Sequence, residues 1–418
     1  MKSVNNTIII ILLFAALFIA AGCDEYEYDE LIPDECAQGV VDPSEKIPEP
    51  VLIKNAAFDV VEAMGVGWCL GNTLDCINNK KTGLNNELAN ITPEEFYETY
   101  WGNPVTTEEM IKAVAEAGFG AVRIPVTYSD HMDDNYVIRA EWLERVRQIV
   151  DYALDNGLYC IINLHHDTGH GSWPWLKADL NGIEHLGDRF RAVWLQIAEF
   201  FIEYDEKLLF ESFNEILDTD DRWDGADPSA YHAVNLLNQI FLDAVRETGG
   251  KNENRFLIVK TYAAGVSKNI IEAFTLPEDG AEGRLIVGAH LYGSLPFAWT
   301  QNNVNWATAY DDWDPVRDGR PVEEHLGALY ERFIKNGIPV IIGEFGAQNK
   351  NNTRDRIEYA VHYVETAARY GITCFWWDDG GQFKSADEVG NFALLERNNA
   401  RWFFPEIVEA MVKAANGR

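Results

Sequence analysis

Short apolar runs and amphipathic segments alternate along the chain from about residue 54 onward. Eight apolar runs have the length of buried strands: 65–71, 121–126, 159–164, 208–213, 255–260, 285–292, 339–346 and 374–380. The segments between them place apolar residues at helical spacing, as in 106–118, 141–157 and 356–371. Several of these segments end on a glycine just before the next strand. This alternation predicts an α/β protein, a (β/α)8 TIM barrel.

An open doubly wound sheet is the alternative fold for such a pattern. No glycine-rich phosphate loop follows the first predicted strand, which weakens that alternative. The closed barrel has a further consequence, because its functional residues lie at the carboxyl ends of the strands. The polar and aromatic residues at these ends are Asn72, Arg123, His165, His166, Asn214, Glu215, His290, Tyr292, Glu344 and Trp377.

Two predicted strands each lead to one glutamate. The stretch "LLFESFNEIL" (208–217) contains Glu215, and "PVIIGEFGAQ" (339–348) contains Glu344. Two carboxylates facing each other are what hydrolysis of a glycosidic bond requires. One carboxyl group must be protonated to donate to the leaving oxygen, and the other must be ionised to attack or to activate water.

The neighbours of the two glutamates assign these roles. Arg123 and Tyr292 can reach Glu344 and hold it ionised, which suits a nucleophile. Glu215 has an amide beside it and no obvious cation in its own strand, so it is better placed as the proton donor. Asn214 is positioned to hydrogen-bond the sugar 2-OH.

Other rim residues admit two interpretations. The run "HHDTGH" (165–170) could bind a metal, but it crosses from strand into loop, and hydrogen bonding to sugar hydroxyls is favoured. We expect no metal and no cofactor. Trp377 is either core or a floor beneath a pyranose ring. The loop residues Trp173, Trp175 and Trp299 could be sugar platforms or ordinary loop packing.

Net charge and cysteine content narrow the possible partners. The formal net charge is −33, which disfavours nucleic acid because phosphate binding needs clustered lysines and arginines. Five cysteines besides Cys23 do not form a disulfide framework, and no spacing matches a zinc site. Whether Cys69 and Cys76 pair is left open.

The amino-terminal segment predicts export. Residues 1–22 have an apolar run, 8–21, that is short for a spanning helix and ends in small residues, as in a signal peptide of the lipoprotein type. Cys23 is the expected lipidation site, with simple cleavage and secretion as the alternative. Residues 23–53 form an acidic, proline-containing tether, and 54–418 the catalytic barrel. We expect a monomeric bacterial outer-membrane or cell-surface lipoprotein that touches the membrane only through this anchor.

Seven stretches resemble glycoside hydrolase family 5, and most closely its endoglucanase and xyloglucanase subfamily 4. They are "AMGVGWCLGNTLD", "WGNPVTTEEMIKAVAEAGFGAVRIPVTY", "IINLHHD", "FESFNEI", "GAHLYG", "VIIGEFGA" and "FWWDDGG", between about residues 60 and 380. The resemblance implies a retaining endo-acting hydrolase of β-1,4-glucans such as cellulose, xyloglucan or mixed-linkage glucan.

The resemblance also implies site roles, with Glu215 as acid/base and Glu344 as nucleophile. It places six residues around the sugar at subsite −1: Arg123, His165, Asn214, His290, Tyr292 and Trp377. Asn72 and His166 match sugar-contacting positions of the subfamily. Cys69 and Asp379 stand where the family usually has asparagine, which bears on glucan preference. The alternatives are a non-catalytic surface glycan-binding lipoprotein, an exo-acting β-glycosidase, and a family member active on β-mannan or xylan.

Overall fold

The computed structural model describes residues 55–78, 92–299, 309–380 and 385–417. The predicted leader 1–22, the lipidation site Cys23 and the tether 23–53 lie outside these ranges. Among the helices that are described, none combines the length and the apolar character needed to cross a membrane.

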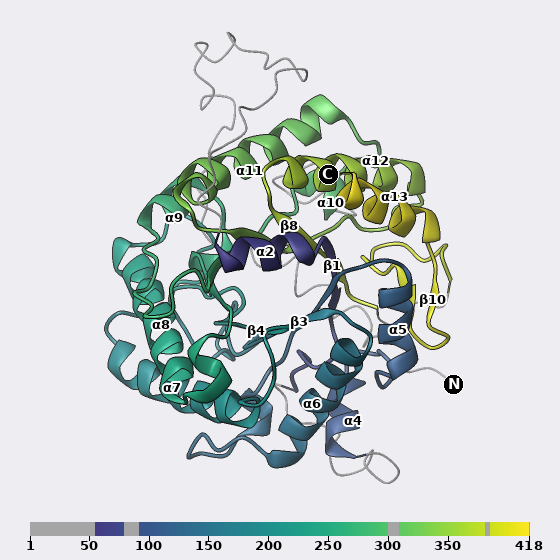
Figure 1. Ribbon diagram of the computed structural model, residues 1–418. Coiled ribbons are helices and arrows are strands. Elements are labelled where there is room, and N and C mark those ends of the chain that lie inside the picture. Colours follow the sequence, from purple (N-terminus) through teal and green to yellow (C-terminus); the bar gives the residue numbers. More distant parts are fainter. Residues whose placement is uncertain (1–54, 79–91, 300–308, 381–384, 418) are drawn as a thin grey trace, which may run out of the picture. The chain divides into compact units, whose positions relative to one another are not determined.

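Eight parallel strands close into a barrel in sequence order (Figure 1). They are β1 (Val66–Leu70), β2 (Ala121–Ile124), β3 (Tyr159–Asn163), β4 (Leu208–Glu211), β5 (Leu257–Lys260), β6 (Leu285–His290), β7 (Val340–Phe345) and β8 (Thr373–Asp378). Seven predicted apolar runs contain one of these strands each, and the eighth run, 374–380, covers all of β8 except Thr373. Strand β1 pairs with β8 to complete the circle. The predicted (β/α)8 barrel is therefore confirmed, and the open sheet is wrong.

Helices surround the strands (Figure 1). The longer ones are α5 (Glu108–Glu116), α6 (Ala140–Asp155), α7 (Ile183–Phe200), α8 (Pro228–Glu247), α11 (Arg320–Arg332), α12 (Thr353–Arg369) and α13 (Pro405–Asn416). The shorter ones are α2 (Ala56–Ala63), α4 (Pro93–Glu98), α9 (Lys268–Ala273) and α10 (Leu295–Ala298). The three amphipathic segments predicted from the sequence correspond to α5, α6 and α12.

Apolar side chains form two cores. One fills the space between strands and helices, and the other lies inside the barrel. The inner core joins α2 to one inward residue from nearly every strand, including Ala121, Ile161, Leu209 and Ile258. Since strand side chains alternate with a period of two, the residue two positions later on each strand also faces inward.

These next inward positions are polar on four consecutive strands. They are Arg123 on β2, Asn163 on β3, Glu211 on β4 and Lys260 on β5, and all four side chains are buried. The barrel interior thus changes from an apolar layer near α2 to a charged layer at the carboxyl ends of the strands. The candidate site is built on this charged layer.

Candidate active site

Glu215 and Glu344 face each other across the carboxyl ends of the strands. Glu344 lies within β7, while Glu215 lies in the segment that follows β4. His290, at the end of β6, lies between them: its Nδ1 is 2.8 Å from Glu215 Oε1 and 3.6 Å from Glu344 Oε2. One carboxylate oxygen of each glutamate and one ring nitrogen of His290 all lie within 4.8 Å of one another. The two carboxyl groups are therefore brought together as the sequence predicted.

An irregularity in the sheet brings His290 to this position. The register between β6 and β7 shifts between Ala289 and His290, so His290 pairs with Glu344. Such bulges redirect side chains beside functional sites. Gly343 also leaves room for the ring, because a Cβ there would lie 3.1 Å from His290 Nε2.

Two donors hold Glu344. Arg123 Nη1 donates to its Oε1 at 2.9 Å, and the Tyr292 hydroxyl donates to its Oε2 at 2.9 Å. The Glu344 side chain is 7% exposed, whereas that of Glu215 is 23% exposed. Both oxygens of Glu344 accept a hydrogen bond, which favours its ionised form.

The pKa values of the two carboxyl groups separate in the expected direction. Burial, followed by the neighbouring Glu344 carboxylate, raises the pKa of Glu215 to about 8. Burial also raises the pKa of Glu344, but Arg123, Lys260 and the Tyr292 hydroxyl counteract it. Glu344 therefore loses its proton first, and Glu215 keeps its proton near neutral pH.

Asn214 is oriented by the same arginine. Arg123 Nη2 donates to its Oδ1 at 2.9 Å, so the amide NH2 remains as the group that can donate to a ligand. The Asn214 backbone N–H donates to Leu164 O at 2.8 Å, which ties this segment to the end of β3. The amide thus lies beside both the arginine and the acid.

A series of rings leads outward from Trp377. The rings of Trp377 and His165 are stacked with centroids 5.7 Å apart, and His165 meets His166 edge-on at 4.6 Å. His166 in turn contacts Trp101 at 5.2 Å and Trp173 at 5.7 Å. His165 is nearly buried and the two outer tryptophans are partly exposed. The series could support a ligand that extends away from the two glutamates.

Asn72 lies in the loop that follows β1. Its backbone has a φ of 55°, its N–H donates to Asp75 Oδ2 at 3.1 Å, and its carbonyl accepts from Asn103. Asp75 also faces His165 and His166 at about the outer limit of an ion pair, 4.0 and 3.9 Å. Asn72 is thus fixed by its own loop, on the β1 side of the rim.

The loop tryptophans divide into two kinds. Trp175 Nε1 donates to Asp167 Oδ1 at 2.6 Å, and the Arg189 guanidinium covers its ring at 4.0 Å, so Trp175 is a packing residue. Trp299 contacts Tyr292 edge-on at 4.9 Å. Trp173 and Trp299 therefore remain as candidate platforms.

Sequence reasoning missed the buried partners of these groups. Glu211 accepts from Arg123 Nε at 3.1 Å and from Arg123 Nη2 at 2.6 Å, and Lys260 Nζ lies 3.7 Å from its Oε1. Lys260 Nζ is also 2.8 Å from His290 Nε2. The signal was the period of two, which puts Glu211 and Lys260 in the same inward layer as Arg123.

Among the residues that the structure describes, two groups of side chains have the spacing of metal ligands: Asp75 with His165 and His166, and Glu215 with His290 and Glu344. Both ring nitrogens of His290 already have partners, Lys260 and Glu215. His166 Nδ1 binds Asp75 O at 2.7 Å. A metal ion could bind at either group only by displacing these hydrogen bonds.

The cysteine pairing left open by the sequence is resolved by the structure. Cys69 and Cys76 are both buried and do not pair with each other, and the buried Cys160 and Cys374 are likewise outside any disulfide among the described residues. Cys69 donates to Gly343 O at 3.3 Å, and burial raises the pKa of its thiol. The residue that replaces the usual asparagine is thus a neutral thiol beside the strand that carries Glu344.

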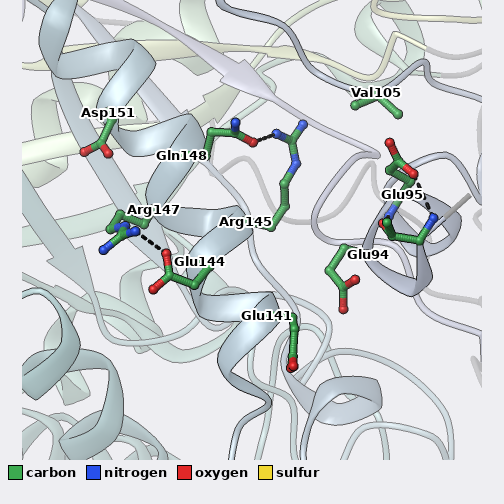
Figure 2. A pocket seen from close by; sticks show the side chains of 10 residues that line it. Glu94, Glu95, Val105, Glu141, Glu144, Arg145, Arg147, Gln148 and Asp151 are labelled. Carbon is green, nitrogen blue, oxygen red and sulfur yellow. Dashed lines mark hydrogen bonds and ion pairs between the residues drawn. The ribbon is translucent and has the colours of Figure 1, made fainter.

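A separate pocket lies between α4 and α6 (Figure 2). It has a volume of about 490 Å³, and its lining includes Glu94, Glu95, Arg145 and Arg147. Its charged groups already pair within the protein, since Arg145 donates to Gln148 and to Glu98. Neither Glu215 nor Glu344 lines this pocket.

Comparisons with known proteins agree with this geometry. Residues 83–382 match the cellulase family, glycosyl hydrolase family 5. The chain is 38% identical to Endoglucanase A of Ruminococcus albus over 367 residues, which cover 86% of this chain and 93% of that protein. It is 36% identical to Endoglucanase A of Clostridium longisporum, covering 86% of this chain and 66% of that protein.

Solved structures give the same result. A family 5 lichenase from Caldicellulosiruptor in complex with cellotetraose superposes with a TM-score of 0.78 at 37% identity, covering 87% of this chain and 96% of that one. A GH5-4 broad specificity endoglucanase from Ruminococcus champanellensis with bound cellotriose superposes with a TM-score of 0.77 at 36% identity, covering 87% and 99%. The resemblance to the endoglucanase subfamily is confirmed, and the chain belongs to glycosyl hydrolase family 5, the cellulase family.

Proposed function

We propose that this protein is an endo-acting β-1,4-glucanase that cleaves its substrate with retention of configuration. The observation that carries the proposal is the close approach of Glu215 and Glu344, since one carboxyl oxygen of each lies within 4.8 Å of the other. Retaining enzymes hold their carboxyl groups about 5–5.5 Å apart, and inverting enzymes need roughly 6.5–9.5 Å to admit a water molecule. The separation fits direct attack by a carboxylate.

In the proposed mechanism, Glu344 attacks the anomeric carbon while Glu215 protonates the leaving oxygen. The bond to the leaving group breaks, and a covalent glycosyl ester forms on Glu344. Water, deprotonated by Glu215, then attacks the same carbon and releases Glu344 as a carboxylate. Asn214 is the proposed donor to the 2-OH, and Trp377 with His165 and His166 is proposed to line the sugar site.

The substrate is proposed to be a polymer that extends over the outer rings. Trp101 and Trp173 flank His166 on the path outward from Trp377 and could stack on successive sugars. The relatives named above are two endoglucanases, a lichenase and a broad specificity endoglucanase, which together favour a β-glucan. The non-catalytic alternative is not favoured, because both glutamates and both donors to Glu344 are present.

Several measurements test the proposal. A 2-deoxy-2-fluoro cellobioside with a good leaving group should form an adduct on Glu344, identified by peptide mass spectrometry. On soluble β-glucans the viscosity should fall much faster than reducing ends appear, as expected of endo cleavage. Carboxymethylcellulose, xyloglucan, mixed-linkage glucan, glucomannan and xylan should be compared to rank the substrates. An α-configured first product would contradict the retaining mechanism.

The cellular location is also a proposal. We infer from residues 8–23 that Cys23 carries lipid and that the acidic segment 23–53 tethers a monomeric barrel outside the cell. A tethered enzyme of this kind would meet polymer that cannot enter the cell.

A further inference from the structure

Lys260 is a charged side chain inside the barrel whose contacts lead to the proposed acid. It ends β5, and its side chain is fully buried. Its backbone is held on both sides by Asn238 of α8, which accepts from Lys260 N at 3.1 Å and donates to Lys260 O at 2.8 Å. Gly288 makes room for the aliphatic stem, since a Cβ there would lie 2.9 Å from Lys260 Cδ. Lys260 is thus built into the barrel interior.

The contact with His290 determines where that ring carries its proton. Lys260 Nζ is 2.8 Å from His290 Nε2, and an ammonium can only donate. Burial and the charge of Lys260 lower the pKa of His290, so the ring is neutral and its proton lies on Nδ1. Nδ1 then donates to Glu215 Oε1 at 2.8 Å, which leaves Glu215 Oε2 to carry the acidic proton.

The five charged or ionisable side chains around the proposed acid and nucleophile have the same net charge before and after the first chemical step. Burial lowers the pKa of Lys260, but the nearby Glu211, Glu344 and Glu215 counteract this and favour its charged form. In the proposed free enzyme Arg123 and Lys260 are cationic, Glu211 and Glu344 are anionic, and Glu215 is protonated. In the proposed glycosyl intermediate Glu344 is a neutral ester and Glu215 has become the carboxylate. The group is neutral in both states, while the negative charge has moved from the Arg123 side to the Lys260 side.

We propose that Lys260 is a positioning residue that holds His290 as a donor to Glu215 and supplies the counter-charge for the Glu215 carboxylate in the covalent intermediate. This inference rests on the proposed function. The chemical step it serves is the second one. Water forms a bond to the anomeric carbon, the bond to Glu344 breaks with its electron pair returning to Glu344, and the water proton passes to Glu215.

Other groups also face Glu215 and His290, and the test must separate Lys260 from them. They are Arg123 on β2, His165 after β3, Glu211 on β4, Tyr292 after β6 and Glu344 on β7. Replacing Lys260 leaves these side chains in place, but Glu211 loses one of its two cations and keeps Arg123. Three replacements separate charge from hydrogen bonding: Lys260→Arg keeps both, Lys260→Gln keeps a donor without charge, and Lys260→Met removes both.

The readout is the steady-state rate on a dinitrophenyl cellobioside, whose leaving group needs little protonation. With this substrate kcat/KM reports formation of the intermediate, and kcat reports its hydrolysis. We expect Lys260→Met to lower kcat at least tenfold and KM by a similar factor, with kcat/KM above its acidic limb within about twofold of the wild type. A burst should appear, and azide should restore kcat. Lys260→Gln should lie between Met and Arg.

The pH dependence gives a second readout. Loss of the cation should make Glu215 harder to ionise, so the acidic limb of kcat on the dinitrophenyl substrate should move to higher pH. The basic limb of kcat/KM should also move to higher pH on phenyl cellobioside, whose poor leaving group needs the acid. The acidic limb of kcat/KM, set by Glu344, should move less, because Arg123 and Tyr292 still hold that carboxylate. Equal loss of kcat and kcat/KM, or limbs that do not move upward, would overturn the inference, because partial unfolding lowers both parameters equally. If the wild type forms no adduct on Glu344, the glycosidase proposal itself fails; an adduct without the kinetic split refutes only the role of Lys260.

Discussion

The hydrogen bond from Tyr292 to Glu344 can be removed with little other change. Tyr292→Phe deletes one hydroxyl whose oxygen lies 2.9 Å from Glu344 Oε2 and keeps the ring that packs against Trp299. A hydrogen bond to a charged group contributes about 1.5–3 kcal/mol. Since about 1.36 kcal/mol corresponds to one pKa unit, the pKa of Glu344 should rise by roughly one to two units.

The sign of the effect on activity follows from the role of Glu344. The proposed nucleophile must be ionised, so a higher pKa moves the acidic limb of kcat/KM to higher pH by the same one to two units. Below that limb the variant should be roughly 10- to 100-fold less active than the wild type. The basic limb, set by Glu215, should move much less. Initial rates on an aryl cellobioside between about pH 4 and 9 measure both limbs.

Tyr363→Phe is the matched control. Tyr363 is also buried. Its hydroxyl donates to the carbonyl of Leu291, the residue before Tyr292, at 2.6 Å, and not to Glu215 or Glu344. This variant should lower the melting temperature and leave the pH profile unchanged. An acidic limb that stays in place in Tyr292→Phe, or that moves equally in both variants, would refute the assignment of Glu344 as the ionised group held by Tyr292.

Three further outcomes test the remaining assignments. Azide should rescue Glu344→Ala with an inverted glycosyl azide and Glu215→Ala with a retained one, both configurations read by NMR; the reverse pattern would exchange the two roles. The basic limb of kcat/KM for the wild type should lie near pH 8, because burial and the Glu344 carboxylate raise the pKa of Glu215 to about 8, and activity should fall as Glu215 ionises above that pH. Cys23→Ala should release active enzyme from the membrane fraction with unchanged specific activity, whereas wild-type protein already free and unlipidated would contradict the anchor.

The fold could be predicted because every strand of the barrel is buried on both faces. Such strands are continuous apolar runs, and each of the eight runs coincides with one strand to within a few residues. The meeting of Glu215, Glu344, Arg123 and Tyr292 could be predicted for a related reason. The carboxyl ends of parallel strands in a closed barrel lie on one rim, whatever the sequence distance between them.

The supporting charges could not be predicted in the same way. The period of two places Glu211 and Lys260 on the inward face beside Arg123, but it does not show which charged group each of them contacts. As the sequence indicates, β4 itself carries no cation beside Glu215. The nearby cation is instead on β5: Lys260 contacts His290 on β6, and His290 contacts Glu215. The register shift that moves His290 opposite Glu344 has no local sequence signal either.

The nature of the cation on β2 explains how one residue can serve both the core and the site. Arg123 donates through Nε and Nη2 to Glu211, through Nη1 to Glu344, and through Nη2 to Asn214. The planar fork spans three acceptors in fixed directions, which the compact ammonium of a lysine cannot do. Glu211 neutralises part of this charge, so Arg123 can be buried without an excess of positive charge beside Glu344. Arg123 thus holds the Glu344 carboxylate ionised and oriented for attack. The second cation, Lys260, is then positioned beside the proposed acid, Glu215.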